Sequence, residues 1–597
     1  MTLTMQNPFY VDENKRWFKK WWPEGVPLNV IFEEKSINDL LDEQVDKYAK
    51  DNFIWFLDTW ITYKRFQDYV KSLATALINL GIKKGDVVAL YLPNCPQYIV
   101  SYYAITRIGA IANGINPTYQ PVEVLHQLDI TNPKVLIILD ALYESSIKPI
   151  IKEIKVETVI YTNLTDLVEI TGFKKAIGKF VKKIPAGKVD FPGALKFKEL
   201  LKTKPEVQEV TFDAKEHPAT YIMTGGTTGL PKAAVLSHFN VVSNAEQCKL
   251  WLGGERPGIG NIGILPLFHS FAHTVIMNTT LIIGGWIMLF PTPPSQVELC
   301  EQIERLPCKE GLIYAGTEIL FKNLAELKNL NRRFPRVMGK LTLCISSAGP
   351  LHRTVRDAFV KNTGGRIVEG YGLSEASPAV SAGNLFGESP VGSIGMPFPG
   401  TEWGIWPADD FNKGPICKGD PKDKNFGIEF SGEICVTGPQ IMLEYLNEPE
   451  ETANTIIEYE DKLWLLTGDI GFMNEDGTIE IRDRKKQLIK CKGYSVFPKE
   501  IEELLLKHPD ITEAAVAGLP DEEYGEIIKA WVSIKEDCDC SPQKIKEWAE
   551  NNMAHYKVPH KVAIIGKIPK NLLLGKVQRR ILQESDPIWK EKHRNNK

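Results

Sequence analysis

The feature that most restricts the fold of this chain is the alternation of strand and helix patterns between residues 60 and 140. An amphipathic helix pattern ends at Gly81, and a second helical segment covers 96–110. The apolar runs around them occupy residues 85–93, 112–116 and 134–140. Short strands separated by helices are typical of a parallel α/β sheet. The same pattern resumes at 220–226 and continues to about residue 400.

Further along the chain the pattern changes twice. Residues 400–480 contain short alternating segments with turn signals between them, which predicts a smaller β-rich subdomain. The residues after the charged run at 482–486 predict a compact α+β domain. We therefore expect an α/β fold in which residues 1–485 form a large N-terminal domain and residues 486–597 a small C-terminal domain. The lysine-rich stretch 160–205 is interpreted as a surface insertion.

Composition narrows the class of protein. The 597 residues carry a formal net charge of −4, so no overall basic excess favours nucleic-acid binding. The 10 cysteines are scattered without a CxxC pair, which favours a reducing compartment, and Cys538-Asp539-Cys540 is interpreted as an exposed loop without partners. The start of the chain has no apolar signal-peptide core, and the longest apolar run, Thr280–Phe290, is too short to cross a membrane. We expect a soluble cytoplasmic protein.

The strongest local motif is TGGTTGLPK, from Thr224 to Lys232, which follows an apolar strand pattern. Its glycines allow backbone N–H groups to turn toward an anion, and its threonine hydroxyls and lysine ammonium supply further donors. It lacks the GK[ST] ending of a Walker loop. Glycines alone would leave an ordinary turn as an equal alternative, but glycines, hydroxyls and a lysine together favour a phosphate cradle.

Two shorter patterns resemble known sites but lack the required context. Gly258–Gly263 matches GxGxxG, yet a loop precedes it and a strand-like run follows it, the reverse of a dinucleotide-binding fold. His269 and His273 have a zinc-like spacing, but the glutamate of HExxH is missing and Pro266 argues against a long helix. We expect neither a dinucleotide site nor a metal site there.

Two further motifs suit nucleotide chemistry. In EGYGLSE (369–375) a tyrosine between glycines can lay its ring against a planar base, and a hydroxyl followed by a carboxylate suits Mg²⁺ beside a triphosphate. Asp469, in the sequence TGD, is expected at a turn where its carboxylate can accept from both hydroxyls of a ribose. Taken alone, the first motif is more typical of an ordinary turn, and the charged run 482–486 is more typical of a solvated face.

Together these motifs resemble those of the adenylate-forming superfamily of acyl-CoA synthetases, luciferases and peptide-synthetase adenylation domains. TGGTTGLPK resembles its phosphate loop, LPLFHSF (265–271) its aromatic/histidine motif, YGLSE its adenine and magnesium motif, and TGD its ribose motif. DRKKQLIKCKGYSVFPKEIE (483–502) resembles its hinge, and IPKNLLLGKVQRR (568–580) its C-terminal lysine motif. The N-terminal third looks most like long- and medium-chain fatty-acyl-CoA ligases.

The resemblance implies an ATP- and Mg²⁺-dependent acid–thiol ligase. Such an enzyme activates a medium- to long-chain fatty acid as acyl-AMP and transfers it to coenzyme A, releasing AMP and diphosphate. The alternatives are an enzyme that stops at acyl-AMP or loads a carrier protein, a CoA ligase for a short, hydroxy or aryl acid, and a catalytically silent acyl-nucleotide sensor. The presence of both Lys232 and Lys576 argues against the sensor.

The resemblance also implies residue roles, with the C-terminal domain swinging about Lys486 between the two half-reactions. Those implied for ATP and AMP are Thr224, Gly225, Gly226, Thr227, Thr228, Gly229, Lys232, Ser347, Ala348, Gly349, Gly370, Tyr371, Gly372, Ser374, Asp469 and Arg484. Those implied for catalysis are Lys576, His269, Thr228 and Lys490, with Glu375 on Mg²⁺. Those implied for coenzyme A are Lys492, Gly493 and Tyr494, and for the acyl pocket Phe268, Ala272, Ala315 and Gly316.

Several positions depart from the family pattern. Gly225 stands where serine is commoner, and Ala233 where glycine is usual. Ala272-His273 replaces a glycine-containing stretch, and Ala315-Gly316-Thr317 replaces hydrophobic-Pro-Thr, so the departures in the acyl pocket bear on substrate identity. The stretch 571–574 is one residue longer than usual before the glycine-lysine pair.

The segment Lys15–Pro23 mixes basic and aromatic residues, a composition that suits a membrane interface. Packing of its tryptophans on the parent domain is the interpretation we favour. Peripheral contact with a membrane and assembly as a homodimer both stay open from the sequence.

Overall fold

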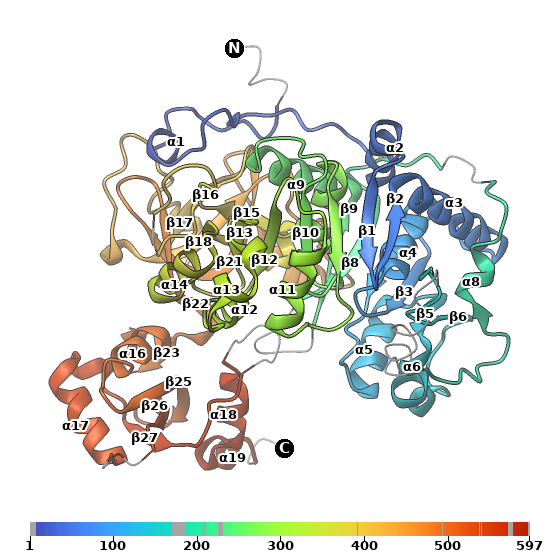
Figure 1. The fold of residues 1–597 in the computed structure, drawn as a ribbon. Coiled ribbons are helices and arrows are strands. Elements are labelled where there is room, and N and C mark those ends of the chain that lie inside the picture. The colour runs from blue at the N-terminus through green and yellow to red at the C-terminus, as the bar shows by residue number, and fades with distance from the viewer. Residues whose placement is uncertain are drawn as a thin grey trace.

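The computed structural model describes residues 7–169, 186–206, 210–224, 231–390, 392–491, 494–536, 538, 540–570 and 577–594. Within these residues the strands form four sheets. Figure 1 shows one large body and, below it, a smaller lobe made of the last strands and helices. The larger helices are α2 (Ile37–Tyr48), α3 (Tyr63–Asn79), α4 (Pro96–Arg107), α5 (Pro121–Thr131), α9 (His238–Trp251), α11 (Gln296–Arg305), α12 (Glu318–Ala325) and α14 (Arg353–Thr363).

The first sheet has the strand order β19-β9-β8-β4-β3-β5-β6-β7. Its strands are β3 (Val87–Tyr91), β4 (Ile111–Gly114), β5 (Val135–Leu139), β6 (Thr158–Thr162), β7 (Leu195–Lys196), β8 (Pro218–Met223), β9 (Ala233–Ser237) and β19 (Glu444–Tyr445). Strands β3, β4, β5 and β6 run parallel, which confirms the expected α/β sheet. The interpretation of 160–205 as an insertion is wrong at both ends, because β6 enters it and β7 pairs with β6 inside it.

The second sheet has the order β16-β15-β14-β13-β12-β10-β11-β1-β2. Its strands are β1 (Asn52–Phe56), β2 (Thr59–Thr62), β10 (Gly260–Gly263), β11 (Trp286–Leu289), β12 (Leu312–Gly316), β13 (Leu341–Ser346), β14 (Ile367–Gly372), β15 (Ala379–Ala382) and β16 (Met396–Pro397). Strands β10, β12, β13 and β14 are parallel neighbours. Their carboxyl ends therefore meet along one edge, where ligands of open α/β sheets bind.

The third sheet is antiparallel, as the alternating pattern of 400–480 predicts. It consists of β17 (Glu402–Trp406), β18 (Gly432–Thr437), β20 (Ile456–Tyr459), β21 (Lys462–Met473) and β22 (Ile479–Arg484). The strand β21 is long enough to pair with β18, β20 and β22. Because β22 ends at Arg484, the chain leaves this sheet directly into the predicted hinge.

The smaller lobe is built from residues after Lys485. Its sheet contains β23 (Ile489–Cys491), β24 (Tyr494–Val496), β25 (Ile511–Asp521), β26 (Gly525–Ile534) and β27 (Lys561–Ile564). Helices α16 (Pro498–Leu505), α17 (Pro542–Asn552), α18 (Arg579–Ser585) and α19 (Pro587–Arg594) cover it. Its two apolar clusters contain only residues from 489 onward. The boundary at 485/486 stays a prediction, and the lobe has the core that it requires.

The N-terminal tryptophans pack on the large body. Trp17 is fully buried and lies edge-on to Trp403 at 6.1 Å between ring centroids. Trp22 lies edge-on to Trp251, and the indole N–H of Trp21 donates to Asp476 at 2.7 Å. The favoured packing interpretation is thus confirmed. In the part of the chain that the structure describes, none of the helices combines the length and apolar character needed to cross a bilayer.

Candidate active site

Four neighbouring parallel strands deliver the predicted site segments to one edge. His269 lies beyond β10, Ala315 and Gly316 end β12, Ser347–Gly349 follow β13, and Gly370–Gly372 end β14. Glycine is required at position 372, since a Cβ there would collide with the carbonyl oxygen of Pro378, the residue before the paired strand β15. The parallel order of the sheet therefore brings together segments that are about 100 residues apart in the sequence.

The centre of the site is a hydrogen-bonded set of Tyr371, Asp469 and Arg484. The Tyr371 hydroxyl donates to Asp469 Oδ2 at 2.7 Å, and Arg484 Nε lies 2.8 Å from Asp469 Oδ1. Burial raises the pKa of Tyr371 well above its usual value, and the nearby Asp469 charge raises it further. The tyrosine therefore stays a hydroxyl donor at neutral pH. The set joins the end of β14 to the β-rich sheet.

The strand β21 places Asp469 in this set. The chain bends at Gly468, whose φ of 70° suits glycine, and Asp469 pairs with Arg484 across β21 and β22. The backbone N–H of Asp469 donates to Thr467 Oγ1 at 3.1 Å. The prediction of a turn at Asp469 is wrong, because the residue belongs to a strand that is bent at the preceding glycine.

The predicted phosphate loop connects two antiparallel strands, β8 and β9. Its first and last residues close on each other, since Thr224 N donates to Lys232 O at 2.8 Å. The Lys232 ammonium forms an ion pair of 2.5 Å with Glu451 and lies over the Tyr445 ring, 5.4 Å from its centroid. This ion pair lowers the pKa of Glu451. Lys232 is thus held at the mouth of the loop by an acid that a phosphate can replace.

Glu375 is linked to Lys232 through Tyr445. Tyr445 donates its hydroxyl proton to Glu375 Oε1 at 2.6 Å, so one tyrosine contacts both Glu375 and Lys232. Ser374 Oγ lies 3.2 Å from Ser270 Oγ, next to His269. Carboxylate oxygens are ligands that Mg²⁺ prefers, and Glu375 is half-buried with a second oxygen beyond its bond to Tyr445. The residues present therefore fit a magnesium ion.

Three of the predicted acyl-pocket residues share one apolar cluster between the sheets. Ala272 and Ala315 are fully buried in it, and Phe268 packs against it. Gly316 differs, because a Cβ there would point at Leu320 and Phe321 of α12, 3.2 Å away. The small side chains at 272 and 315 therefore belong to the packed cluster, whereas Gly316 permits close packing of α12.

The two histidines after β10 have separate environments. His269 Nδ1 accepts from Phe271 N at 3.3 Å, beside the Ser270–Ser374 contact. His273 is buried in η3 (Ala272–Asn278), edge-on to Tyr102, and burial lowers its pKa to about 3. A neutral His273 deep in the apolar cluster belongs to the core.

The predicted hinge is held on both sides. Lys485 Nζ forms an ion pair of 2.6 Å with buried Glu433 of the β-rich sheet. Gln487 Oε1 accepts from Arg579 Nη1 of the smaller lobe at 2.7 Å. Lys486, which lies between them, is exposed. Lys485 is thus attached to the large body, and Gln487, two residues later, to the smaller lobe.

Some predicted site residues lie outside the described residues: Gly225, Gly226, Thr227, Thr228, Gly229, Lys492, Gly493 and Lys576. Tyr494 is described only as part of β24. Lys490 is exposed, and its backbone N–H donates to Glu526 at 2.7 Å. The stretch 571–574, which is one residue longer than usual, also lies outside the described residues.

Sequence reasoning missed Tyr445, Glu451 and Glu433. These residues contact Glu375, Lys232 and Lys485, respectively, and each pair is separated by more than 50 positions. Glu451 lies in an acidic first turn after Pro449, which is a local helix-start signal and carries no information about its partner.

Family models and known relatives match most of the chain. Residues 41–446 match the model of the AMP-binding enzyme family, and residues 500–572 that of the AMP-binding enzyme C-terminal domain. A long-chain-fatty-acid–CoA ligase of Bacillus subtilis is 32% identical over 580 residues, covering 96% of this chain and 99% of that protein. A probable 4-coumarate–CoA ligase of Dictyostelium discoideum is 30% identical, with coverages of 94% and 97%.

Solved structures share the fold. ATP-bound MatB from Rhodopseudomonas palustris superposes with a TM-score of 0.73 at 22% identity, covering 93% of this chain and 100% of that one. A long-chain-fatty-acid–CoA ligase, FadD1, from Archaeoglobus fulgidus gives a TM-score of 0.63 at 22% identity, with coverages of 92% and 100%. At these identities the likeness concerns the fold alone.

Proposed function

The chain belongs to the AMP-binding enzyme family, and from that premise we propose that it is an ATP-dependent long-chain-fatty-acid–CoA ligase. It activates a medium- to long-chain fatty acid as acyl-AMP and transfers the acyl group to coenzyme A, releasing AMP and diphosphate. The observation that carries the proposal is the set Tyr371–Asp469–Arg484 at the carboxyl ends of the parallel strands. End-to-end identity of about a third with ligases of this name supports it.

The nucleoside of ATP binds at this set. The bonds from Tyr371 and Arg484 orient the Asp469 carboxylate, which is an acceptor suited to the ribose hydroxyls. The Tyr371 ring and the segment Ser347–Gly349 provide the surface for adenine. These bonds fix the carboxylate before the nucleotide arrives, which lowers the ordering cost of binding.

The triphosphate binds between the loop 224–232 and Glu375. Lys232 exchanges its partner Glu451 for phosphate oxygens, while Thr224, Thr227 and Thr228 donate hydroxyl protons. Glu375 holds Mg²⁺, which when bound neutralises part of the phosphate charge. The contact of Ser374 with Ser270 holds the segment that contains Glu375 close to the segment that contains His269.

The first half-reaction needs positive charge at the α-phosphate. The fatty-acid carboxylate attacks the α-phosphorus, diphosphate leaves, and an acyl-AMP mixed anhydride results. Lys576 supplies an ammonium donor to the carboxylate and the α-phosphate, where negative charge develops. His269 lies between the acyl pocket and the phosphates.

The second half-reaction needs a different set of groups. The thiolate of coenzyme A attacks the acyl carbon and AMP leaves, so Lys576 has no further role at the reacting centre. Rotation at Lys486 carries Lys490, Lys492, Gly493 and Tyr494 to the site in its place. Attachment of Lys485 to Glu433 and of Gln487 to Arg579 supports this hinge, because the backbone rotation is confined to the residue between them.

Coenzyme A-dependent AMP release from a series of acids tests the function. Each buried CH₂ adds about 0.8 kcal/mol of binding, so kcat/KM should rise with chain length until the pocket ends. The relative named as a probable 4-coumarate–CoA ligase keeps an aryl acid as a second candidate. A maximum at acetate or at an aryl acid would refute the fatty-acid assignment, and AMP release that does not depend on coenzyme A would refute the ligase.

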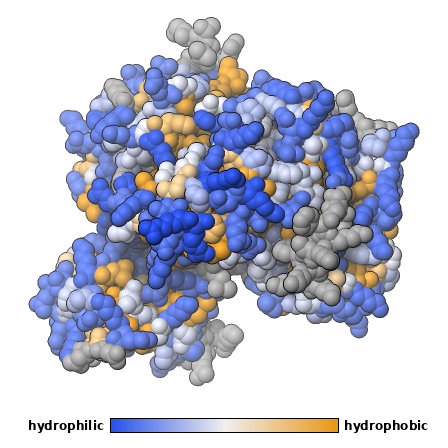
Figure 2. Space-filling view, viewed as in Figure 1, coloured by the Kyte–Doolittle hydropathy of each residue, from blue (hydrophilic) through white to orange (hydrophobic). Residues whose placement is uncertain are grey.

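A cytoplasmic location with peripheral membrane contact, and a homodimer, are separate proposals. The tryptophans of the N-terminal segment are occupied in packing, so a membrane contact needs another surface. Figure 2 shows apolar residues scattered over the visible face of the large body. Vesicle co-sedimentation and light scattering of the purified chain test the two proposals independently.

A further inference from the structure

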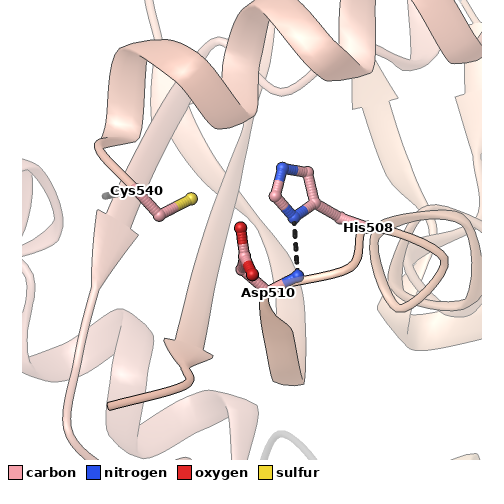
Figure 3. Close-up of side chains that lie close together, drawn as sticks. All are labelled: His508, Asp510 and Cys540. Carbon is pink, nitrogen blue, oxygen red and sulfur yellow. Dashed lines mark hydrogen bonds between the residues drawn. The ribbon is translucent and has the colours of Figure 1, made fainter. Parts of the chain in front are cut away.

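Three metal-ligating side chains meet in the smaller lobe, outside the nucleotide site (Figure 3). His508 and Asp510 precede β25, and Cys540 follows β26. Because Ile511 pairs with Ile534, the segment before β25 and the segment after β26 lie at the same end of the hairpin. The ligand atoms of the three side chains all lie within 4.8 Å of one another.

This juxtaposition overturns one expectation. Cys540 was expected in an exposed loop without partners, yet it is half-buried beside His508 and Asp510. The reason is topological: the antiparallel ladder of β25 and β26 brings together positions about 30 residues apart, and no local spacing pattern announces that contact.

We propose that His508, Asp510 and Cys540 bind a divalent cation of the zinc class. The three side chains offer one nitrogen, one oxygen and one sulfur, the donor types that zinc takes in proteins. Magnesium and calcium prefer oxygen ligands alone, so the thiol and the imidazole argue against them. Three protein ligands leave one tetrahedral position for water.

The ligand-bearing segments are held by regular structure. The Asp510 carbonyl accepts from Lys535 N at 2.9 Å, which ties this loop to the end of β26. Ser541, next to Cys540, caps α17 by accepting from Lys544 N. The His508 ring lies edge-on to Trp548 of α17, 5.3 Å between centroids. The side chains therefore stand on the ends of a hairpin and a helix.

The hydrogen bonding of His508 defines what binding must change. Its Nδ1 accepts from Asp510 N at 3.1 Å, as the dashed line in Figure 3 marks, so Nε2 carries the proton of the neutral ring. A cation at Nδ1 displaces this bond, and a cation at Nε2 moves the ring proton to Nδ1 and also breaks it. The Cys540 thiol releases its proton to solvent as the sulfur–metal bond forms.

The site is separate from the proposed reaction. Figure 1 places α17 on the side of the smaller lobe that faces away from the large body. Metal binding should therefore stabilise the lobe, because a ligand that binds only the folded state shifts the unfolding equilibrium. The proposal stands independently of the ligase assignment.

Titration of the full chain, free of any affinity tag, with Zn²⁺ and with Co²⁺ tests the site. We expect one equivalent bound with a sulfur-to-cobalt charge-transfer absorption, and a change in the Asp510 amide resonance. Cys540→Ser, His508→Gln and Asp510→Asn should each weaken binding by at least about tenfold, the low end of what losing even an outer partner costs. Cys540→Ser should also abolish the charge-transfer band.

His555→Gln is the matched control, because His555 is exposed in the same lobe and outside the cluster. It should bind the cation as the unmodified chain does. Far-UV circular dichroism checks that every variant is folded, and three substitutions keep the test decisive if one of them is not. Equal binding by all variants, an equal loss in His555→Gln, or the absence of stoichiometric binding would overturn the proposal.

Discussion

The chain is attached to the β-rich sheet in two contrasting ways. At the N-terminal end, Trp17 is fully buried and Lys15 pairs with Glu402 and Asp420 at 2.8 and 2.7 Å. At the other end, the contacts of the smaller lobe with this sheet include two partly buried polar ones, Arg482 to Glu500 at 3.4 Å and Lys499 N to Asp483 at 2.8 Å. The proposed rotation of the smaller lobe requires the second attachment to break while the first one holds.

The contrast has an energetic basis. A buried cation that loses its partners costs several kcal/mol, whereas an exposed ion pair contributes about 0–1 kcal/mol. The Arg482–Glu500 pair falls between these limits, because both side chains are 22% exposed. Gly419 and Gly477 reinforce the first attachment, because a Cβ at either position would collide with Trp17. An enzyme whose lobe alternates between two positions requires a weak junction there and a firm one elsewhere.

Removal of Trp17 should have the largest effect on stability. Trp17→Ala removes a fully buried indole and should lower the free energy of unfolding of the large body by about 3–5 kcal/mol. Denaturant unfolding followed by circular dichroism measures the loss. Trp589→Ala, at a half-buried position in the smaller lobe, is the control and should cost less. If the two variants lost equal amounts of unfolding free energy, Trp17 would not make the N-terminal attachment unusually firm.

Removal of the Lys576 ammonium should have the largest effect on catalysis. Lys576→Ala should slow acyl-AMP formation by about 10²–10³, or about 2.7–4 kcal/mol, because a donor is lost where negative charge develops. Thioester formation from supplied acyl-AMP and coenzyme A should stay nearly intact. Single-turnover kinetics of each half-reaction separates the two steps.

Lys567→Ala is the matched control for that variant, since it removes the same charge from an exposed position nine residues earlier. It should leave both half-reactions near the rates of the unmodified chain. If Lys576→Ala slowed both half-reactions equally, the smaller lobe would not exchange one set of groups for another.

The sequence predicts the sheets better than it predicts the contacts that hold the site. Strand and helix patterns are local, so the parallel sheets and the β-rich sheet could be predicted from them. The site segments at 269, 371 and 469 are proposed from motifs and the family resemblance, and their roles stay predictions. The contacts that hold the site could not be predicted, because they join residues more than 50 positions apart: Glu451 to Lys232, Tyr445 to Glu375 and Glu433 to Lys485. Pairing across such distances leaves no periodic pattern in the sequence.

The bend at Gly468 was missed for a related reason. A threonine-glycine-aspartate sequence is typical of a turn, but pairing of β21 with β18 and β22 overrides the local preference. The strand continues through the glycine, which supplies the positive φ that the bend requires. Local chemistry identified the carboxylate, and tertiary pairing decided its geometry.

Restriction of the hinge should affect only the second half-reaction. Lys486→Pro fixes φ at one residue between the attachments of Lys485 and Gln487. Thioester formation should slow by about 10- to 100-fold, the size of effect that misplaced groups produce, while acyl-AMP still forms and accumulates. Lys486→Ala, which keeps the backbone free, is the control. A loss confined to acyl-AMP formation would contradict rotation at this residue.

The smallest expected effect is a pH dependence of an ion pair that joins α12 to the start of α14 within the large body. His352 Nδ1 lies 2.7 Å from Glu318 Oε1, and this bond raises the pKa of the imidazole. From the smaller lobe, Lys499 lowers that pKa and Glu503 raises it. A pKa raised by folding stabilises the folded state fully below the unfolded value of about 6.5, and the contribution is lost as pH rises through the folded value.

Because the His352 side chain is 61% exposed, solvent screening limits this contribution to at most about 1 kcal/mol. The free energy of unfolding should therefore fall by that amount between about pH 6 and about pH 8, relative to His352→Gln, which keeps a polar side chain without a titrating ring. Urea unfolding of both proteins at the two pH values measures the difference. Parallel pH profiles would show that folding gains nothing from this pair, and a difference of several kcal/mol would show that solvent screens the pair far less than the exposure of His352 implies.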